Sequence, residues 1–474
     1  MYVFESFIII NKNIFLMSEE KNFDWIKGAK IYQVFLDRFA GHKSIFTEDE
    51  LRKGFLYGNM KALMTKLDYI KSLNFNMIWL TPFYVNQPMG YHGYHTENYN
   101  HVDPRFAYGE NILDNNKGDV FDENDVNIET GADLVLKELI QECHKRDIKI
   151  MMDFVPNHCY MTHPFFEDAQ KNENSKYRNW FYFEKNEENK EDEDEEKEEA
   201  KKGKKRKKKE DDKKLLSKKK KRTPEITHLG FLSFGDLPKL NLKNNEVQNH
   251  LINSTLKFLK YGIDAVRIDH CIGPDPSSLK IIISKIHEQF PKVPFIGEIL
   301  PFGISEHSET ILGISYEKLK KLEKIDLNSL KALDEIFLEY IGCLDGVLDF
   351  TFQYYVDMFV KGNLDEKKCT EEIEKHFKRF ENKNFILIKN IDSHDCDRIL
   401  FRCKNNYRLF QKSMEFLYKD WEKRNDPIVV YYGTEDFMNQ EKTIHGEPYG
   451  DFRCRQPMYF TNCWINNLFK EEKK

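Results

Sequence analysis

Long apolar runs, paired cysteines and a strong net charge are all lacking in this sequence. No stretch reaches the ~18 consecutive apolar residues of a membrane span, so no membrane association is predicted. The nine cysteines do not show the short paired spacings of a zinc site or of a secreted disulfide framework, which favours a reducing compartment. A net charge of −6 over 474 residues gives no electrostatic reason to expect nucleic acid as a partner.

The N-terminal segment 3–10 is the one candidate targeting signal. It is mostly apolar, but it contains Glu5 and no basic residue precedes it, whereas a secretory signal has a positive start and a longer apolar run. We therefore expect a cytoplasmic protein, with secretion as the alternative.

Charged residues make up 32% of the chain, against roughly 25% in typical domains. The surplus lies in residues 184–222, a run of 39 residues with 14 acidic and 18 basic side chains. Such a stretch cannot bury enough apolar surface to offset the entropy lost on ordering. We interpret it as a solvated low-complexity insertion, and a docking or nucleic-acid-binding arm is the alternative. The whole chain, with 40% hydrophobic residues, is nevertheless not a disordered or collagen-like protein.

Outside that run, short β-rich segments alternate with amphipathic helical patterns. Eight strands with helices between them predict a parallel sheet, and the count matches a (β/α)8 TIM barrel, an α/β fold. A doubly wound open sheet is the alternative, because a strand count cannot show closure. The predicted strands are 31–36, 77–80, 148–154, 265–269, 295–298, 347–352, 385–391 and 428–432. The clearest predicted helices are 60–73, 132–145, 247–260, 277–290 and 407–421.

Polar residues gather where four of these strands end, and in a parallel barrel those ends share the rim that carries the active site. Arg267 and Asp269 are two residues apart on a strand and therefore point the same way, which would keep Asp269 ionised. Glu298 follows an apolar run and is the group expected to keep a proton. Two carboxyls whose pKa values are pushed apart match the nucleophile and acid of a retaining glycoside hydrolase. The four segments are DFVPNH (153–158), DAVRIDH (264–270), FIGEI (295–299) and NIDSHD (390–395).

In this order, the four segments resemble the four short regions shared by the α-amylase superfamily of glycoside hydrolases. The resemblance implies a barrel with a small subdomain inserted after its third strand. It also implies an all-β domain after the barrel, but only about 40 residues follow the last predicted strand, so we expect this C-terminal β-sandwich to be largely absent. Further matching segments are IYQVFLDRFAG (31–41), GYHGYHTENYNHVDPRFA (90–107) and PIVVYYGTED (427–436).

The resemblance also implies roles for individual residues. Asp269 is expected to be the nucleophile, Glu298 the general acid and then base, and Asp395 the third carboxylate, which binds the distorted sugar. Structural roles are expected for Asp153 and Asn157. The residues expected to bind substrate are His92, Tyr94, His158, Arg267, His394, Asp451 and Arg455.

The segment LPKLN (237–241) resembles a region typical of the neopullulanase and cyclomaltodextrinase branch, which favours short α-glucans or cyclic dextrins as substrates.

Calcium is expected to be dispensable, because Asn157 alone matches the calcium site of α-amylases and Gly273 stands where a His is usual. The acidic stretches 114–119 and 122–125 show no ordered ligand spacing, so we expect plain solvated loops. No required cofactor and no metal ligand are therefore predicted, and calcium binding at this acidic loop is the alternative.

The expected function is retaining hydrolysis of α-1,4 bonds in starch-derived oligosaccharides or cyclodextrins, with α-1,6 bonds as a further option. One alternative is a transglycosylase, which shares the first half-reaction but passes the sugar to another sugar. The other is a non-catalytic scaffold, which the presence of all three carboxylates disfavours. The oligomeric state is left open.

The expected parts of the chain are an N-terminal extension (1–25), the first part of the barrel (26–155), the inserted subdomain (156–240), the rest of the barrel (241–460) and a tail (461–474).

Overall fold

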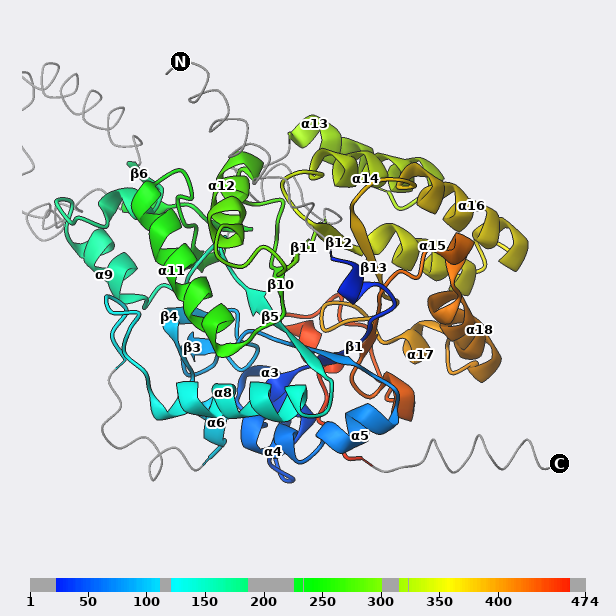
Figure 1. Ribbon diagram of the computed structural model, residues 1–474, viewed down its shortest axis with the longest axis horizontal. Coiled ribbons are helices and arrows are strands. Elements are labelled where there is room, and N and C mark those ends of the chain that lie inside the picture. The colour runs from blue at the N-terminus through cyan, green and yellow to red at the C-terminus, as the bar shows by residue number, and fades with distance from the viewer. Residues whose placement is uncertain are drawn as a thin grey trace, which may run out of the picture.

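The computed structural model describes residues 23–110, 121–185, 226–232, 234–300, 315–322 and 324–460. Its centre is a closed barrel of eight parallel strands, which confirms the predicted barrel and rules out the open sheet (Figure 1). All eight predicted strands are present. They are β1 (Lys30–Val34), β2 (Met77–Leu80), β5 (Lys149–Phe154), β10 (Ala265–Ile268), β11 (Phe295–Gly297), β12 (Gly346–Asp349), β13 (Ile386–Lys389) and β14 (Ile428–Tyr431).

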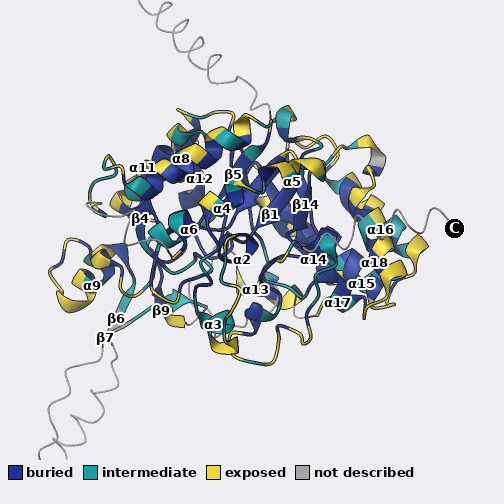
Figure 2. Cartoon of the chain, turned by 90° about the horizontal axis from the view of Figure 1, so that it is seen from below, coloured by how far each residue is buried: buried dark blue, intermediate teal, exposed yellow. Residues whose placement is uncertain are grey.

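Amphipathic helices surround the barrel, and their buried residues face it (Figure 2). Local sequence sets their limits. The longest begins after Asn244, whose side chain accepts the Glu246 N–H, and ends at Gly262 in the left-handed conformation. Within the described residues, the helices are too short or too polar to cross a membrane. The longer helices are α8 (Gly131–His144), α11 (Asn245–Tyr261), α12 (Pro276–His287), α14 (Leu327–Glu339), α15 (Phe350–Val360), α16 (Glu366–Arg379) and α18 (Tyr407–Tyr418).

Shorter elements complete the connections between the barrel strands. The short helices are α2 (Leu36–Phe39), α3 (Glu48–Lys53), α4 (Met60–Met64), α5 (Leu67–Ser72), α6 (Pro104–Tyr108), α9 (Pro164–Lys171), α13 (Tyr316–Leu319) and α17 (Ile399–Arg402). The 3₁₀ turns are η1 (Asp24–Ile26), η2 (Arg178–Trp180), η3 (Lys320–Leu322), η4 (Trp421–Lys423), η5 (Thr434–Asp436) and η6 (Gly450–Arg453). Three antiparallel pairs join β3 (Tyr84–Asn86) to β4 (Thr96–Val102), β6 (Phe183–Lys185) to β7 (Ile226–His228), and β8 (Gly230–Phe231) to β9 (Phe234–Pro238).

Several predicted elements are wrong in their limits, and at two of them side chains bond to backbone groups where the element breaks or ends. The predicted helix 60–73 is broken into α4 and α5. The Ala62 carbonyl accepts the Thr65 N–H at 3.1 Å and the Thr65 hydroxyl at 2.7 Å, instead of the N–H of Lys66 that a continuous helix would supply. The predicted strand 347–352 ends early at Asp349, whose carboxylate accepts the Phe352 N–H at 2.9 Å and begins α15.

The stretch 122–125 is not the plain solvated loop that we expected. Glu123 is buried and accepts hydrogen bonds from the Tyr99 N–H at 2.9 Å, His250 Nε2 at 2.7 Å and His163 Nε2 at 3.2 Å. Burial raises the pKa of Glu123, but the two histidines lower it to about 2. Glu123 therefore links β4 to α11 and to the residue that precedes α9. Residues 114–119 lie outside the described part of the chain.

His376 on α16 is fully buried between two carboxylates. Its Nδ1 lies 2.8 Å from Asp334 Oδ1 on α14, and its Nε2 lies 2.9 Å from Asp349 Oδ2 at the end of β12. Burial lowers the pKa of His376, but the two carboxylates raise it to about 10. One charged imidazole therefore ties two outer helices to a barrel strand.

The segment between β5 and α11 carries most of the additional structure on the barrel. It contains α9, the pair β6–β7 and the pair β8–β9. The charged insertion predicted over 184–222 falls, from residue 186 onward, outside the described residues, as do the N-terminal residues 1–22 and the tail 461–474. The strands on either side of the insertion pair directly, with Phe183 opposite His228.

Candidate active site

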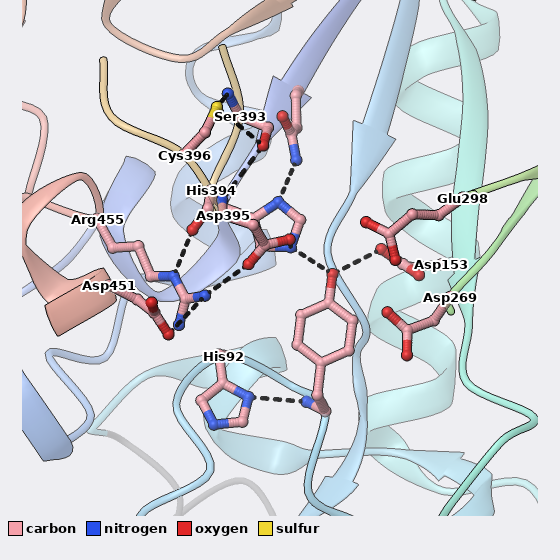
Figure 3. Close-up of polar contacts among 12 residues, drawn as sticks. His92, Asp153, Asp269, Glu298, Ser393, His394, Asp395, Cys396, Asp451 and Arg455 are labelled. Atoms are coloured by element: carbon pink, nitrogen blue, oxygen red, sulfur yellow. Dashed lines mark hydrogen bonds and ion pairs between the residues drawn. The ribbon is translucent and has the colours of Figure 1, made fainter. Parts of the chain in front are cut away.

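The C-terminal ends of four barrel strands bring the three predicted catalytic carboxylates and the predicted structural residue Asp153 to one place. Asp153 is on β5, and Asp269, Glu298 and Asp395 follow β10, β11 and β13. Figure 3 shows Asp153, Asp269 and Glu298 together on one side and Asp395 with Arg455 on the other. The parallel register, in which Arg267 of β10 lies opposite Asp153 of β5, places these polar side chains at the same rim.

Arg267 is the centre of the carboxylate group. Its Nη1 lies 2.6 Å from Asp153 Oδ1 and 2.9 Å from Asp269 Oδ1, and its Nη2 lies 2.6 Å from Glu298 Oε1. The guanidinium is fully buried, so its charge is little screened by solvent. The spacing of two residues predicted the Asp269 contact, whereas the contacts to Asp153 and Glu298 follow from the neighbouring strands.

The surroundings of the buried carboxyl groups shift their pKa values. Burial raises the pKa of Glu298, Arg267 lowers it, and the charges of Asp269 and Asp395 raise it again, so that it stays above its usual value. Burial likewise raises the pKa of Asp153 to about 7, against the opposing effect of Arg267. Glu298 is therefore a carboxyl poised to hold a proton beside an ion-paired aspartate.

Asp395 is held in its ionised form by two basic groups. Its Oδ2 lies 3.0 Å from His394 Nε2, and its Oδ1 accepts from Arg455 Nη2 at 2.8 Å. Burial raises the pKa of Asp395, but His394 and Arg455 bring it well below its usual value. Arg455 is itself buried and also pairs with Asp451 Oδ2 at 3.3 Å, so it is not an ordinary surface residue.

The loop between β3 and β4 closes the site with aromatic residues. The Tyr94 hydroxyl lies 2.9 Å from Asp153 Oδ2 and 2.7 Å from His394 Nε2, and the rings of Tyr94 and His394 are parallel with centroids 5.5 Å apart. His92 accepts the Tyr94 N–H at 3.1 Å. Burial lowers the pKa of His92 well below its usual value, so this imidazole is neutral. His158 contacts the same loop, with Nε2 3.2 Å from the Tyr94 carbonyl.

This constellation agrees with the comparison with protein families. A family model described as the alpha amylase catalytic domain matches residues 33–113 and 110–275, together just over half of the chain. The chain belongs to the α-amylase family. The family predicted from the four strand-end segments is thereby confirmed.

Similar proteins include several α-amylase family members of greater length. Alpha-amylase 2 of Dictyoglomus thermophilum is 27% identical over 430 residues, covering 89% of this chain and 58% of that protein. The intracellular maltogenic amylase of Bacillus subtilis is 23% identical over 430 residues, covering 88% of this chain and 57% of that protein. This chain thus spans less than two thirds of the length of these relatives.

A similar solved structure extends the likeness in fold. Cyclic alpha-maltosyl-(1→6)-maltose hydrolase from Arthrobacter globiformis, in complex with maltose, has a TM-score of 0.64 at 20% identity. The match covers 94% of this chain and 82% of that chain. At this identity, the likeness supports the barrel fold and carries no conclusion about substrate.

The calcium site of the α-amylase family does not fit the residues present here. Asn157 is buried, and its amide atoms have no hydrogen-bond partner among the described residues. The backbone of Gly273 lies close to the Asn157 side chain, because a Cβ on Gly273 would lie 2.3 Å from Asn157 Oδ1. There is therefore no room for a side chain at position 273 to supply a further ligand. The buried Lys239 ammonium donates to the Gly273 carbonyl at 3.1 Å and brings a positive charge to the same loop. No group of three His, Cys, Asp or Glu residues in the described ranges could hold a metal ion.

We therefore expect chelation to leave the fold unchanged. The Tm in excess EDTA should equal the Tm in buffer with added calcium, because a site with one neutral oxygen ligand and a nearby ammonium offers calcium too few ligands. Differential scanning calorimetry measures both values. A Tm that falls in EDTA and recovers with calcium would contradict this expectation.

Among the residues that contact the predicted site, Trp79 and Gln33 were missed in the sequence. Trp79 on β2 donates from Nε1 to Asp153 Oδ2 at 3.2 Å, and Gln33 Nε2 on β1 lies 2.8 Å from His394 Nδ1. Gln33 interrupts the apolar run of its strand, and a polar side chain inside a buried strand was a usable signal. Trp79 gave no such signal, because an indole in a buried strand is ordinary core.

Proposed function

We propose that this protein hydrolyses α-glucosidic bonds in starch-derived oligosaccharides or cyclic dextrins with retention of anomeric configuration. The observation that carries the proposal is the buried Arg267 guanidinium, which contacts both Asp269 and Glu298. Because an aspartate paired with Arg267 and a carboxyl with a raised pKa share one cation, the pair supports a nucleophile and an acid acting on the same bond.

In the first half-reaction, the Asp269 carboxylate attacks the anomeric carbon while Glu298 gives its proton to the glycosidic oxygen. The bond to the leaving sugar breaks, and a glycosyl ester of Asp269 forms. In the second half-reaction, the Glu298 carboxylate takes a proton from water as the water oxygen attacks the anomeric carbon. The ester bond then breaks, which restores Asp269 as a carboxylate and Glu298 as an acid.

The remaining residues would position the sugar and stabilise positive charge at its anomeric carbon. Asp395 is ionised and held by Arg455, so its carboxylate is preorganised to bind sugar hydroxyls. Tyr94 and His394 fix one another through their hydroxyl and imidazole groups. Arg267 keeps Asp269 in the orientation for attack.

The substrate class rests on the segment 237–241 and on the names of similar proteins. The intracellular maltogenic amylase of Bacillus subtilis and a cyclomaltodextrinase of Geobacillus thermopakistaniensis are among those relatives. A product profile on starch, pullulan, cyclodextrin and maltose tests the proposal. Faster cleavage of cyclodextrin than of starch would support the cyclodextrin-acting branch, longer products would indicate transglycosylation, and no turnover on any glucan would favour the scaffold alternative.

The Glu298→Gln variant should separate acid catalysis from nucleophilic attack. We expect kcat on maltotetraose to fall by about 10²–10⁴-fold, the usual contribution of a general acid. With α-maltosyl fluoride, the fluoride ion leaves without a proton, so the first turnover should stay fast and the second half-reaction should be slow. A rapid-mixing measurement should therefore show a burst of fluoride equal to the enzyme concentration.

The matched control is Glu339→Gln, the same change at the exposed end of α14. This control should leave both substrates unaffected. If Glu298→Gln slowed the first turnover of maltotetraose and of the fluoride equally, Glu298 would not be the acid.

A further inference from the structure

The hairpin β8–β9 places a line of aromatic rings beside the site. The Phe231 ring stacks on the His158 ring with centroids 4.7 Å apart, and it meets the His270 ring edge-on at 4.6 Å. Phe234 continues the line at 6.3 Å from Phe231, with the two ring planes 25° apart. The Phe234 side chain is 54% exposed, so this end of the line faces solvent.

We propose that Phe231 and Phe234 form the platform for sugars on the leaving-group side of the scissile bond. The inference rests on the proposed hydrolase function and adds a binding subsite to it. Single exposed aromatic residues are ordinary on protein surfaces. This pair differs because its inner ring packs against residues that adjoin the nucleophile and the acid.

Contacts with the acid decide which side of the bond the rings serve. His270 directly follows Asp269, and its backbone N–H donates to Glu298 Oε2 at 3.1 Å. The acid must stand beside the glycosidic oxygen that it protonates, and the leaving sugar begins at that oxygen. Because the His270 ring contacts Phe231, the line of rings leads away from the acid on the leaving-group side.

The hairpin is held in place from below by the loop after β5. The Cys159 N–H donates to the Pro238 carbonyl at 3.2 Å, and the Met161 N–H donates to the Asp236 carbonyl at 2.9 Å. Within the hairpin, a Cβ on Gly230 would lie 2.1 Å from the Phe234 carbonyl oxygen, so only glycine allows this close approach. The two strands that carry the rings are thus hydrogen-bonded to each other and to the loop after β5, which lowers the ordering cost of binding a sugar face.

Two substrates that differ only beyond the scissile bond test the platform. Maltotetraose places sugars on the leaving-group side, whereas α-maltosyl fluoride places only a fluorine atom there. We expect Phe234→Ala to lower kcat/KM on maltotetraose by about 10-fold, the loss of one aromatic contact surface. The same variant should leave kcat/KM on α-maltosyl fluoride unchanged, and Phe234→Tyr, which keeps the ring, should behave like the wild type on both.

Tyr407→Ala is the matched control, since Tyr407 is a similarly exposed aromatic residue that packs on Phe437. It should leave both substrates unchanged. Equal losses on the two substrates for Phe234→Ala, or no loss on either, would overturn the platform while the hydrolase function stands. If the wild-type protein released neither fluoride nor sugar, the proposed hydrolase function would fail, and the platform with it.

Discussion

Replacing Asp269 by Asn is expected to lower kcat on maltooligosaccharides by at least about 10⁴-fold. The amide keeps the shape of the side chain but cannot form the glycosyl ester, and it removes the charge that pairs with Arg267 at 2.9 Å. The loss should be equally large with α-maltosyl fluoride, because nucleophilic attack is needed whatever the leaving group. Steady-state release of reducing sugar and of fluoride measures both effects.

A surface variant is the control for a general effect of the Asp→Asn change on folding. Asp68→Asn makes the same chemical change at a side chain that is 82% exposed and pairs with Arg146 at the surface. It should retain full activity, and the Tm of the Asp269→Asn protein should show that it folds. Near-normal turnover by Asp269→Asn would remove Asp269 from the nucleophile role.

Replacing His376 by Leu is expected to lower the free energy of unfolding by about 3 kcal/mol or more, the cost of removing one partner from a buried ion pair. Asp334 keeps its pair with Arg379, whereas Asp349 loses the imidazole. Leucine has a similar size, but it leaves Asp334 and Asp349 without the imidazole that lies 2.8 and 2.9 Å from them. Urea denaturation followed by circular dichroism measures the change.

The pH dependence of the free energy of unfolding provides a second, independent test of this prediction. The pKa of His376 is raised from 6.5 to about 10 in the folded protein. A group whose pKa is raised on folding stabilises fully below its unfolded pKa and loses that contribution as the pH rises through its folded pKa. The difference between the wild type and His376→Leu should therefore be largest below about pH 6.5 and should shrink toward pH 10.

His144→Leu is the control for the change of residue type. His144 is partly exposed and lies 2.8 Å from Asp264, so its loss should cost at most about 1 kcal/mol. If His376→Leu were no more destabilising than His144→Leu, the buried imidazole would not hold α14 and α16 to the barrel.

The barrel and its rim were predictable because both depend on patterns within single segments. Each strand is a short apolar run, and Arg267 and Asp269 point the same way on any strand. The three-way pairing of Arg267 depends instead on which strands are neighbours, and only the order β5–β10–β11 brings Asp153 and Glu298 to the same guanidinium.

Other features escaped prediction because the deciding partners lie far away in the sequence. Glu123 stands among acidic residues typical of a solvated loop, yet His163 and His250 from two separate helical regions bury it. Likewise, nothing near Gln33 signals that it orients His394, more than three hundred residues later. Composition and periodicity report on local structure, whereas these contacts arise from how the barrel closes.

The pairing of β6 with β7 makes the charged insertion a permissive place in the chain. Because Phe183 lies opposite His228, the chain leaves and re-enters the fold at neighbouring points. The entropy of closing a loop grows only with the logarithm of its length, at roughly 0.6 kcal/mol for each doubling. The number of residues between these two strands can therefore change at little cost to folding. For the same reason, a foreign domain with adjacent termini can be inserted there while the barrel remains intact.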